Sequence, residues 1–410
     1  MQLGWVDYSR QERETIKELL KLLGESTSLD ELGVGIVRDS ISDLLYPGTS
    51  VLHTRAKYYI LIPELFKKAM KSGLTTGSEV RNLINSDQDR IARALRKVID
   101  EETGTKAAGI IGGRSDRAVK MKPTRIYWNA LRTTEILCNP SMSFDDACMA
   151  VGNYNKKNQN ITIKYESEDD GGDADDAGLG GIALFSAPCH QNIDDYIENP
   201  TLHLTKDEAM YLRDQFLHVP AMKNTLMEYC LKTKTSYEDK SLDEIELQND
   251  MPETLKYNLR LAIEFANFIY GAYIVYNLIF FENGGKNATE DNKQKLEERY
   301  KTWKKNNVGI PHKDEILELV CNHDEYKSKL QEFLTKFENA ARANSSDKCS
   351  DEEKKIVMDR EWFCKKEKSK IGKDFPFQEI QSSPMNYRHD TAQAIISDIL
   401  KGLVRDDGKV

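Results

Sequence analysis

The chain has 410 residues, of which 39% are hydrophobic and 30% charged, and its formal net charge is −9 at pH 7. This length allows two or three domains with cores of their own, and the composition excludes a largely disordered chain. The acidic balance excludes a protein coated with basic residues for nucleic acid, but it permits a local basic patch.

The beginning of the chain and its cysteines indicate a cellular compartment. Residues 1–5 (MQLGW) lack the cationic and apolar regions of a secretory signal. The seven cysteines are scattered, and no two are separated by two residues as in a zinc ribbon. Reduced thiols in a cytosol fit this pattern. We therefore expect a cytoplasmic protein with no metal and no cofactor.

Helical patterns dominate the first part of the chain. A capping box at Ser9 and Glu12 begins an apolar stripe that stops at Gly24. A second stripe covers residues 33–45, and a longer apolar helix is expected over residues 52–70, bent near Pro63. An amphipathic helix follows over residues 86–99, and its polar face carries Arg90, Arg93, Arg96 and Lys97.

A glycine-rich turn separates two of these expected helices. Residues 88–99 and 123–137 flank the turn at residues 109–113 (GIIGG), and Pro123 suits the first position of the second helix. Two interpretations are open: a helix-turn-helix or winged-helix module, and an ordinary helical hairpin.

The middle of the chain changes in composition. Residues 166–176 contain seven acids and two glycines, which is typical of a flexible acidic loop, and residues 161–165 (ITIKY) suggest one strand. We therefore expect three parts, an N-terminal helical domain over residues 1–152, an acidic loop or linker over 153–181 and a C-terminal helical domain over 182–410. The expected fold class is mainly α.

The second half contains an apolar stretch that requires a membrane check. Residues 261–281 are long enough to span a bilayer, but they include Glu264, Asn267 and Asn277. A charged residue in the middle of a membrane helix costs about 2.5–3.5 kcal/mol. A buried helix of a soluble protein explains the segment better, so no membrane partner is expected.

Motifs for common chemistries are missing from the sequence. It contains no phosphate-binding loop, no dinucleotide fingerprint, no HExxH zinc motif and no GxSxG elbow. Cys189-His190 and Cys321-Asn322-His323 each lack the second ligand pair of a structural zinc site. The acidic run also fails the spacing of a calcium loop, because Asp175 stands where that loop requires glycine. No catalytic residue is assigned.

The basic segment at residues 114–125 is the best candidate for a nucleic-acid contact. It has five basic residues and one acid, and aromatic residues follow it directly. Cations of this kind bind phosphates, and aromatic rings stack on exposed bases. The alternative is a solvated loop with Tyr127 and Trp128 packed in the core. The predicted contacts are Arg114, Arg117, Lys120, Lys122, Arg125 and Trp128. A second basic run, residues 365–373, fits a solvated surface.

A further group of charged residues surrounds the turn at residues 47–50 (PGTS). Arg38 with Asp39 and Asp43 fits a buried ion-pair network that holds a helical hairpin, and Arg55 belongs to the same structural motif. The alternative is an acid–base site, in a hydrolase or nuclease, built from Asp39, Asp43 and His53.

These residues also carry a family resemblance. Residues 4–9 (GWVDYS), 29–35 (LDELGVG), 46–50 (YPGTS) and 54–58 (TRAKY) resemble the opening of the uncharacterised bacterial family DUF6361. Tyr46 and Lys57 replace a phenylalanine and an arginine expected in that family. Residues 109–112 with 123–128, Gly271, Tyr387-Arg388 and Asp398-Ile399 are similar to later landmarks of the family.

The resemblance implies a bacterial origin and a loose association with helicase-containing anti-phage loci, but no defined activity. Combined with the basic segment, it leads us to expect a non-enzymatic subunit that contacts DNA or RNA within a larger complex that contains protein partners. The alternative is a pure protein-interaction scaffold that uses the acidic loop and an apolar patch.

Overall fold

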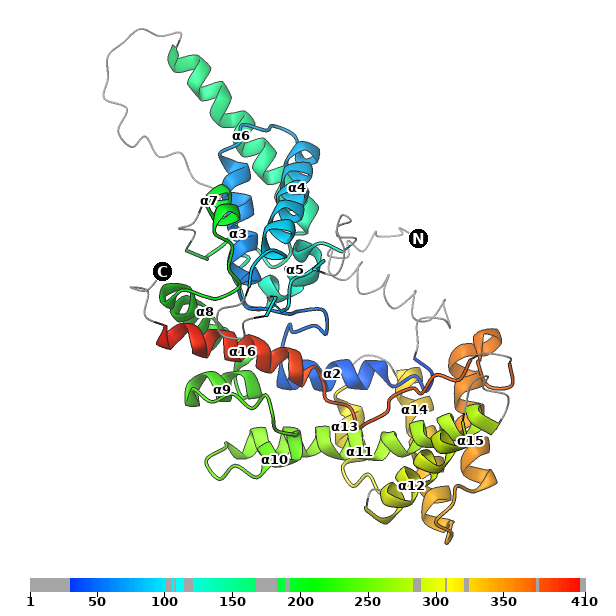
Figure 1. The fold of residues 1–410 in the computed structure, drawn as a ribbon. Helices are drawn as coiled ribbons and strands as arrows, with labels where there is room; N and C mark the ends of the chain where they lie inside the picture. Colours follow the sequence, from blue (N-terminus) through cyan, green and yellow to red (C-terminus); the bar gives the residue numbers. More distant parts are fainter. Residues whose placement is uncertain are drawn as a thin grey trace, which may run out of the picture. The chain divides into compact units, whose positions relative to one another are not determined.

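The computed structural model describes residues 30–99, 105–106, 108–113, 121–166, 183–188, 192–282, 289–306, 308–320, 324–373 and 376–405. In these ranges the chain forms fifteen α-helices and two short 3-10 helices, with isolated bridges but no strand (Figure 1). The prediction of a mainly α protein is therefore confirmed. The helix expected at Ser9–Gly24 and the acidic run after residue 166 lie outside the described residues.

The chain divides into two compact units. The first unit combines Met1–Leu45 with Lys240–Tyr387, and the second combines Tyr46–Asp239 with Arg388–Val410. Each unit is thus built from two separate segments of the sequence. The sequence predicts three consecutive parts with boundaries at residues 152 and 181. That division stays a prediction.

The first unit is organised around one long helix, α11. This helix covers Glu253–Glu282, and α2, α10, α12, α13 and α15 all pack against it. Its partners and the remaining elements of the unit are α2 (Gly35–Leu45), α10 (Leu242–Glu246), α12 (Glu290–Asn306), α13 (Lys313–Glu318), α14 (Asp324–Ala343), α15 (Asp351–Lys365) and η2 (Lys366–Lys368).

Helix α11 is long and apolar enough to cross a membrane, and among the described residues it is the one such helix. In its most apolar window 78% of the residues are buried inside the protein. Its polar groups have internal partners: the Asn277 side chain donates to the Ile380 carbonyl at 2.8 Å, and both carboxylate oxygens of Glu264 lie 2.9 Å from His312 Nδ1. Protein neighbours therefore satisfy the polar groups of this apolar helix, as expected for a core helix.

A close contact between α11 and α12 depends on Gly271. The indole of Trp303 lies over this glycine, and a Cβ atom added there would meet the ring at 2.0 Å. Trp303 Nε1 donates to the Asn267 carbonyl at 2.9 Å, so a polar bond also fixes the ring. A missing side chain on one helix therefore makes room for the largest side chain on the other.

The second unit contains α3 and the helices that surround it. Helix α3 (Tyr58–Met70) packs against α4, α5, α6 and α7, while α16 packs against α8 and α9 (Figure 1). The elements around α3 and α16 (His389–Val404) are α4 (Gly77–Leu95), α5 (Pro123–Thr133), α6 (Phe144–Glu166), α7 (Ile193–Glu198), α8 (Lys206–His218), η1 (Pro220–Met222) and α9 (Leu226–Thr233).

Helix α3 begins at Tyr58, six residues later than the sequence pattern suggests. The backbone N–H groups of Thr54 and Arg55 donate to the Tyr127 hydroxyl at 2.8 and 3.1 Å, and that of Ala56 donates to Asp398 at 2.8 Å. Because side chains from α5 and α16 accept these hydrogen bonds, residues 54–57 form a turn instead of a first helical turn.

Two other predictions have different outcomes. Residues 161–165 continue α6, so the expectation of a strand there is wrong; helical pairing starting at Phe144 extends through them. Pro123 begins α5 as expected, because its missing N–H is harmless at the first helical position. The helix-turn-helix or winged-helix module stays a prediction.

The Gly271 contact gives a direct test of the first unit. Replacement by alanine should lower the free energy of unfolding by about 1–3 kcal/mol, because overpacking against Trp303 outweighs the better helix propensity of alanine. Urea denaturation of the full chain measures this change. The same substitution in a Trp303→Leu background should cost less, and an equal cost in both backgrounds would contradict the contact.

Candidate nucleic-acid interface

Helix α4 presents a basic face to solvent. Its N-terminus is fixed by a capping box, in which Thr76 accepts from the Glu79 N–H and Glu79 accepts from the Thr76 N–H. Its apolar residues, such as Ile84, Ile91 and Leu95, are buried. The opposite face carries Arg90 and Arg93, and the exposed Lys97 lies in the turn after the helix ends at Leu95. The amphipathic pattern therefore directs the two arginines outward.

An open groove lies between α4 and α7. It has a volume of about 720 Å³, and its charged lining consists of Arg90, Arg93, Lys97 and Glu198. Its remaining lining residues are Ala94, Val98, Ile197 and Pro200. Three cations against one carboxylate make this groove a site that attracts anions.

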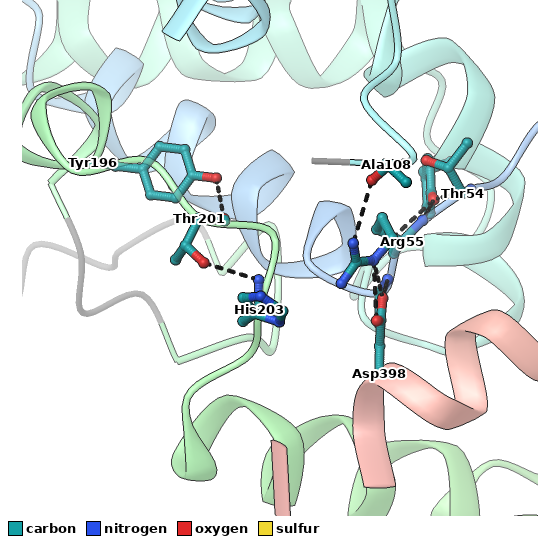
Figure 2. Close-up of polar contacts among 9 residues, drawn as sticks. Thr54, Arg55, Ala108, Tyr196, Thr201, His203 and Asp398 are labelled. Carbon is teal, nitrogen blue, oxygen red and sulfur yellow. Dashed lines mark hydrogen bonds and ion pairs between the residues drawn. The ribbon is translucent and has the colours of Figure 1, made fainter. Parts of the chain in front are cut away.

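The loop after α7, which contributes Pro200 to the lining of the groove, is held in place by local hydrogen bonds. The Tyr196 hydroxyl donates to the Thr201 carbonyl, and the His203 N–H donates to Thr201 Oγ1 at 3.1 Å (Figure 2). Tyr196 is itself buried. The loop beyond Pro200 is therefore anchored in the unit.

The cations of this surface differ in how far acids neutralise them. Asp194 lies between two of them, 3.0 Å from Lys68 Nζ and 2.9 Å from Arg90 Nη1, and these hydrogen bonds lower the pKa of Asp194. Arg93 hydrogen-bonds only to a backbone carbonyl, and neither Arg93 nor Lys97 forms an ion pair with any described residue. Arg93 and Lys97 are therefore the cations available to an anionic ligand.

The glycine turn near residue 110 is held against the core. Arg55 Nη1 donates to the Ala108 carbonyl at 3.3 Å while its Nε binds Asp398 (Figure 2). The Ile111 N–H donates to the Tyr58 hydroxyl at 3.0 Å, and burial raises the pKa of Tyr58 to about 12. Gly109 has a φ of +80°, and a Cβ there would meet Arg55 at 2.7 Å. The turn therefore requires glycine for both its conformation and its packing.

Three of the predicted nucleic-acid contacts, Arg114, Arg117 and Lys120, lie outside the described residues. Lys122 forms an ion pair with Asp89 of α4 and is largely buried, so it attaches the start of α5 to α4. Arg125 is exposed and has no ion pair among the described residues. Arg125 is thus the one described cation of the predicted segment that faces solvent without an acidic partner.

The interpretation of Trp128 as a stacking platform does not fit its position. Trp128 is buried, and its ring packs against Phe66, Phe144 and Phe185 with centroids 5.6–6.1 Å apart. Its Nε1 donates to the Met142 carbonyl at 2.9 Å. Burial and this hydrogen bond make Trp128 a core anchor, the alternative that the sequence left open.

The charged residues around the turn at residues 47–50 also differ from expectation. Arg38 and Asp39 on α2 form an exposed pair, with side chains 45% and 50% accessible, and Asp43 is exposed, so a buried network at these positions is wrong. Arg55 does form a largely buried pair, with Asp398, at 2.9 Å and 16% and 9% accessibility. The structural role predicted for Arg55 thus has a partner 343 residues away, which helical spacing cannot indicate.

His53 has a structural environment. Its ring stacks on Tyr127 with centroids 4.2 Å apart, its Nδ1 accepts from the Ser50 N–H, and its Nε2 donates to the Ile126 carbonyl at 3.1 Å. Burial, together with the charge of Arg388, lowers the pKa of His53 to about 4. Both ring nitrogens are therefore engaged, which does not suit a general base. Asp39 and Asp43 belong to the other unit.

The described residues contain no cluster of three or more histidine, cysteine or acidic side chains that could hold a metal ion. The pairs Cys189-His190 and Cys321–His323 lie outside the described part of the chain.

The groove shows what the sequence interpretation missed. Arg90, Arg93 and Lys97 were recognised as a polar helix face but not as a site. The three-residue spacing of Arg90 and Arg93 places them side by side on one face of α4, and Lys97 follows in the turn after it. This periodicity was the available signal, but the acidic wall contributed by α7 could not be read from it.

The two arginines of the structural motif should behave differently. Arg55→Ala leaves Asp398 buried without its partner and should lower the free energy of unfolding by about 3 kcal/mol. Arg38→Ala removes an exposed pair and should change it by less than about 0.5 kcal/mol. Chemical denaturation of both variants measures the difference; similar losses would contradict the assignment.

His53 should make stability depend on pH. The folded chain excludes a proton that the unfolded chain binds below its ordinary pKa of 6.5. Stability is therefore retained above this pH and lost as the pH falls toward 4, by about 3 kcal/mol in total. His53→Gln should reduce the slope of the unfolding free energy against pH over this interval, by the amount that corresponds to about one bound proton. An unchanged slope in urea titrations at several pH values would exclude a buried neutral His53.

A family model covers nearly the whole sequence. The family of unknown function DUF6361 matches residues 1–407. No curated protein and no solved structure matches the chain. The matched residues include the charged turn at 54–58, the glycine turn and helix α16, which the structure brings together in the second unit. The chain belongs to the DUF6361 family.

Proposed function

We propose that this protein is a cytoplasmic, non-enzymatic subunit that contacts DNA or RNA through the phosphate backbone, within a larger bacterial complex. The observation that carries the proposal is the groove between α4 and α7, whose lining includes Arg93 and Lys97, two cations without an ion pair among the described residues. The assignment to a larger complex, and to anti-phage defence, rests on the family resemblance alone.

The distribution of charge supports a local basic surface. Residues 58–133 contain fifteen Lys and Arg and eight Asp and Glu, a formal charge of +7, whereas the whole chain carries −9. Such an asymmetry draws a polyanion to one region of an otherwise acidic protein and increases the rate of encounter.

The geometry favours contacts with the phosphate backbone of a nucleic acid over recognition of its base sequence. Arg93 on the last turn of α4 and Lys97 in the turn that follows line the same groove. Arg125 adds an exposed cation at the first turn of α5, whose N-terminus is attached to α4 by the Lys122–Asp89 pair and by the bond from Thr124 N–H to Gln88. Contacts of this kind position a nucleic acid without specifying its sequence.

Two features support a non-enzymatic role without membrane contact. His53, the proposed base of the hydrolase alternative, uses both ring nitrogens in internal hydrogen bonds. The apolar surface of α11 is mostly covered by protein. The proposal therefore places neither a catalytic centre nor a membrane anchor in the described residues.

Removal of the three available cations tests the proposal. The variant with Arg93→Ala, Lys97→Ala and Arg125→Ala should bind duplex DNA more weakly, and the plot of log affinity against log salt should become less steep by about 2–3. Fluorescence anisotropy with a labelled duplex, over a series of salt concentrations, measures both quantities.

The matched control replaces three exposed lysines elsewhere, Lys223, Lys305 and Lys401, with alanine. It removes the same charge and should keep the wild-type salt slope. Equal losses in both variants would show a general charge effect, and no binding by the wild type at low salt would exclude the function.

An Arg114→Ala and Arg117→Ala variant tests the predicted segment separately. Co-purification of a protein partner without nucleic acid would favour the scaffold alternative.

A further inference from the structure

Helix α15 in the first unit exposes an unusual group of large side chains. Trp362 is 55% accessible and Phe363 39%, and Met358 is also exposed one turn before Trp362. Residues such as Val357 and Cys364 bury the opposite face of α15. The exposed rings thus lie on the outer side of a helix that is firmly packed on its inner side.

Trp362 differs from the other described tryptophans. Trp128 and Trp303 are buried, and each indole N–H donates to a backbone carbonyl. The Trp362 indole forms no hydrogen bond or ring contact in the described structure. Its ring adds to the exposed apolar area of Met358 and Phe363, and a group of large exposed apolar side chains marks a candidate ligand surface.

Two cationic side chains lie over the neighbouring ring, that of Phe363. The Arg360 guanidinium lies 5.4 Å from the Phe363 centroid and 5.3 Å from that of Phe333, and Lys366 Nζ lies 5.1 Å from Phe363. Arg360 is itself fixed, because it donates to the carbonyls of Leu32 at 2.8 Å and Gly33 at 3.2 Å. The aromatic surface is therefore preorganised rather than loose.

Lysines surround the two rings. Lys355 precedes Trp362 by two helical turns, and Lys366 and Lys368 belong to η2, which follows the end of α15 at Lys365. All three lysines are exposed. The exposed acids Asp351, Glu352 and Asp359 precede the rings, so the excess of cations lies after them, where Lys366 and Lys368 stand against one acid, Glu367. Exposed aromatic rings flanked by cations combine the two parts of a single-strand binding surface, stacking and phosphate attraction.

We propose that this face of α15, made by Met358, Trp362, Phe363 and the three lysines, binds single-stranded nucleic acid. A base stacks on the Trp362 indole, and Lys366 and Lys368 contact the adjacent phosphates. A protein partner fits less well, because lysine is depleted from protein–protein interfaces. Any base can stack, so the surface is tolerant of sequence.

This surface is independent of the groove between α4 and α7. It belongs to the first unit, it depends on aromatic rings that the groove lacks, and it selects unpaired strands whose bases are accessible. Failure of one site therefore leaves the other intact, and variants of each distinguish them.

Tryptophan fluorescence of the full chain provides the test. An oligothymidylate of about 12 nucleotides should quench the emission at low salt, and Trp362→Leu should abolish most of the quenching. The same variant should weaken binding of a labelled oligothymidylate, followed by anisotropy, by about fivefold to a hundredfold. Trp362→Phe, which keeps a ring, should retain part of the affinity.

Matched variants make the outcome decisive. Tyr257→Leu removes an exposed ring from α11 and should leave the affinity unchanged, as should the groove variant of Arg93, Lys97 and Arg125 if the sites are separate. Unchanged affinity in Trp362→Leu would overturn the proposal. Equal quenching by polyglutamate at the same charge concentration would also overturn it, in favour of an acidic protein partner. Thermal unfolding should match the wild type in every variant of the exposed rings.

Discussion

The turn at residues 54–57 is the constraint on which the second unit depends. Its backbone N–H groups bind the Tyr127 hydroxyl and the Asp398 carboxylate, and its cations, Arg55 and Lys57, bind Asp398 and Glu208. Lys57 is almost fully buried, with its ammonium 2.7 Å from Glu208. Because buried charges require partners, this turn can form only when α5, α8 and α16 are in place. The beginning and the end of the unit therefore fold together.

This arrangement separates structural cations from those available to ligands. Arg55, Lys57 and Lys122 are bound to acids inside the second unit, and Lys68 and Arg90 share Asp87 and Asp194. Arg93 and Lys97 extend beyond this network into the groove. The same helix thus contributes residues to the scaffold and to a surface that attracts anions, and its amphipathic pattern decides which residue does which.

Much of the helical architecture was predictable, and the reasons are local. The capping box at Thr205, Pro123 at the start of α5 and the apolar stripe of α11 are short-range signals. The helix expected over residues 86–99 begins nine residues earlier, at Gly77, because a capping box at Thr76 starts it there. The start of α3 was not predictable, because Tyr127 and Asp398 accept the N–H groups that would otherwise begin the helix earlier. The binding segment stays a prediction, and within it Lys122 and Trp128 have structural roles.

The sequence by itself determined the helical class, the local basic character of residues 58–133 and membership of the family, because periodicity, composition and motifs are properties of neighbouring residues. Only the tertiary structure decided which of these cations are neutralised. Asp89, Asp194 and Asp398 reach their partners from other helices, and no sequence spacing records such distances. Likewise, burial alone distinguishes Trp128, a core residue, from Trp362, which remains in contact with water, because exposure depends on what the rest of the chain covers.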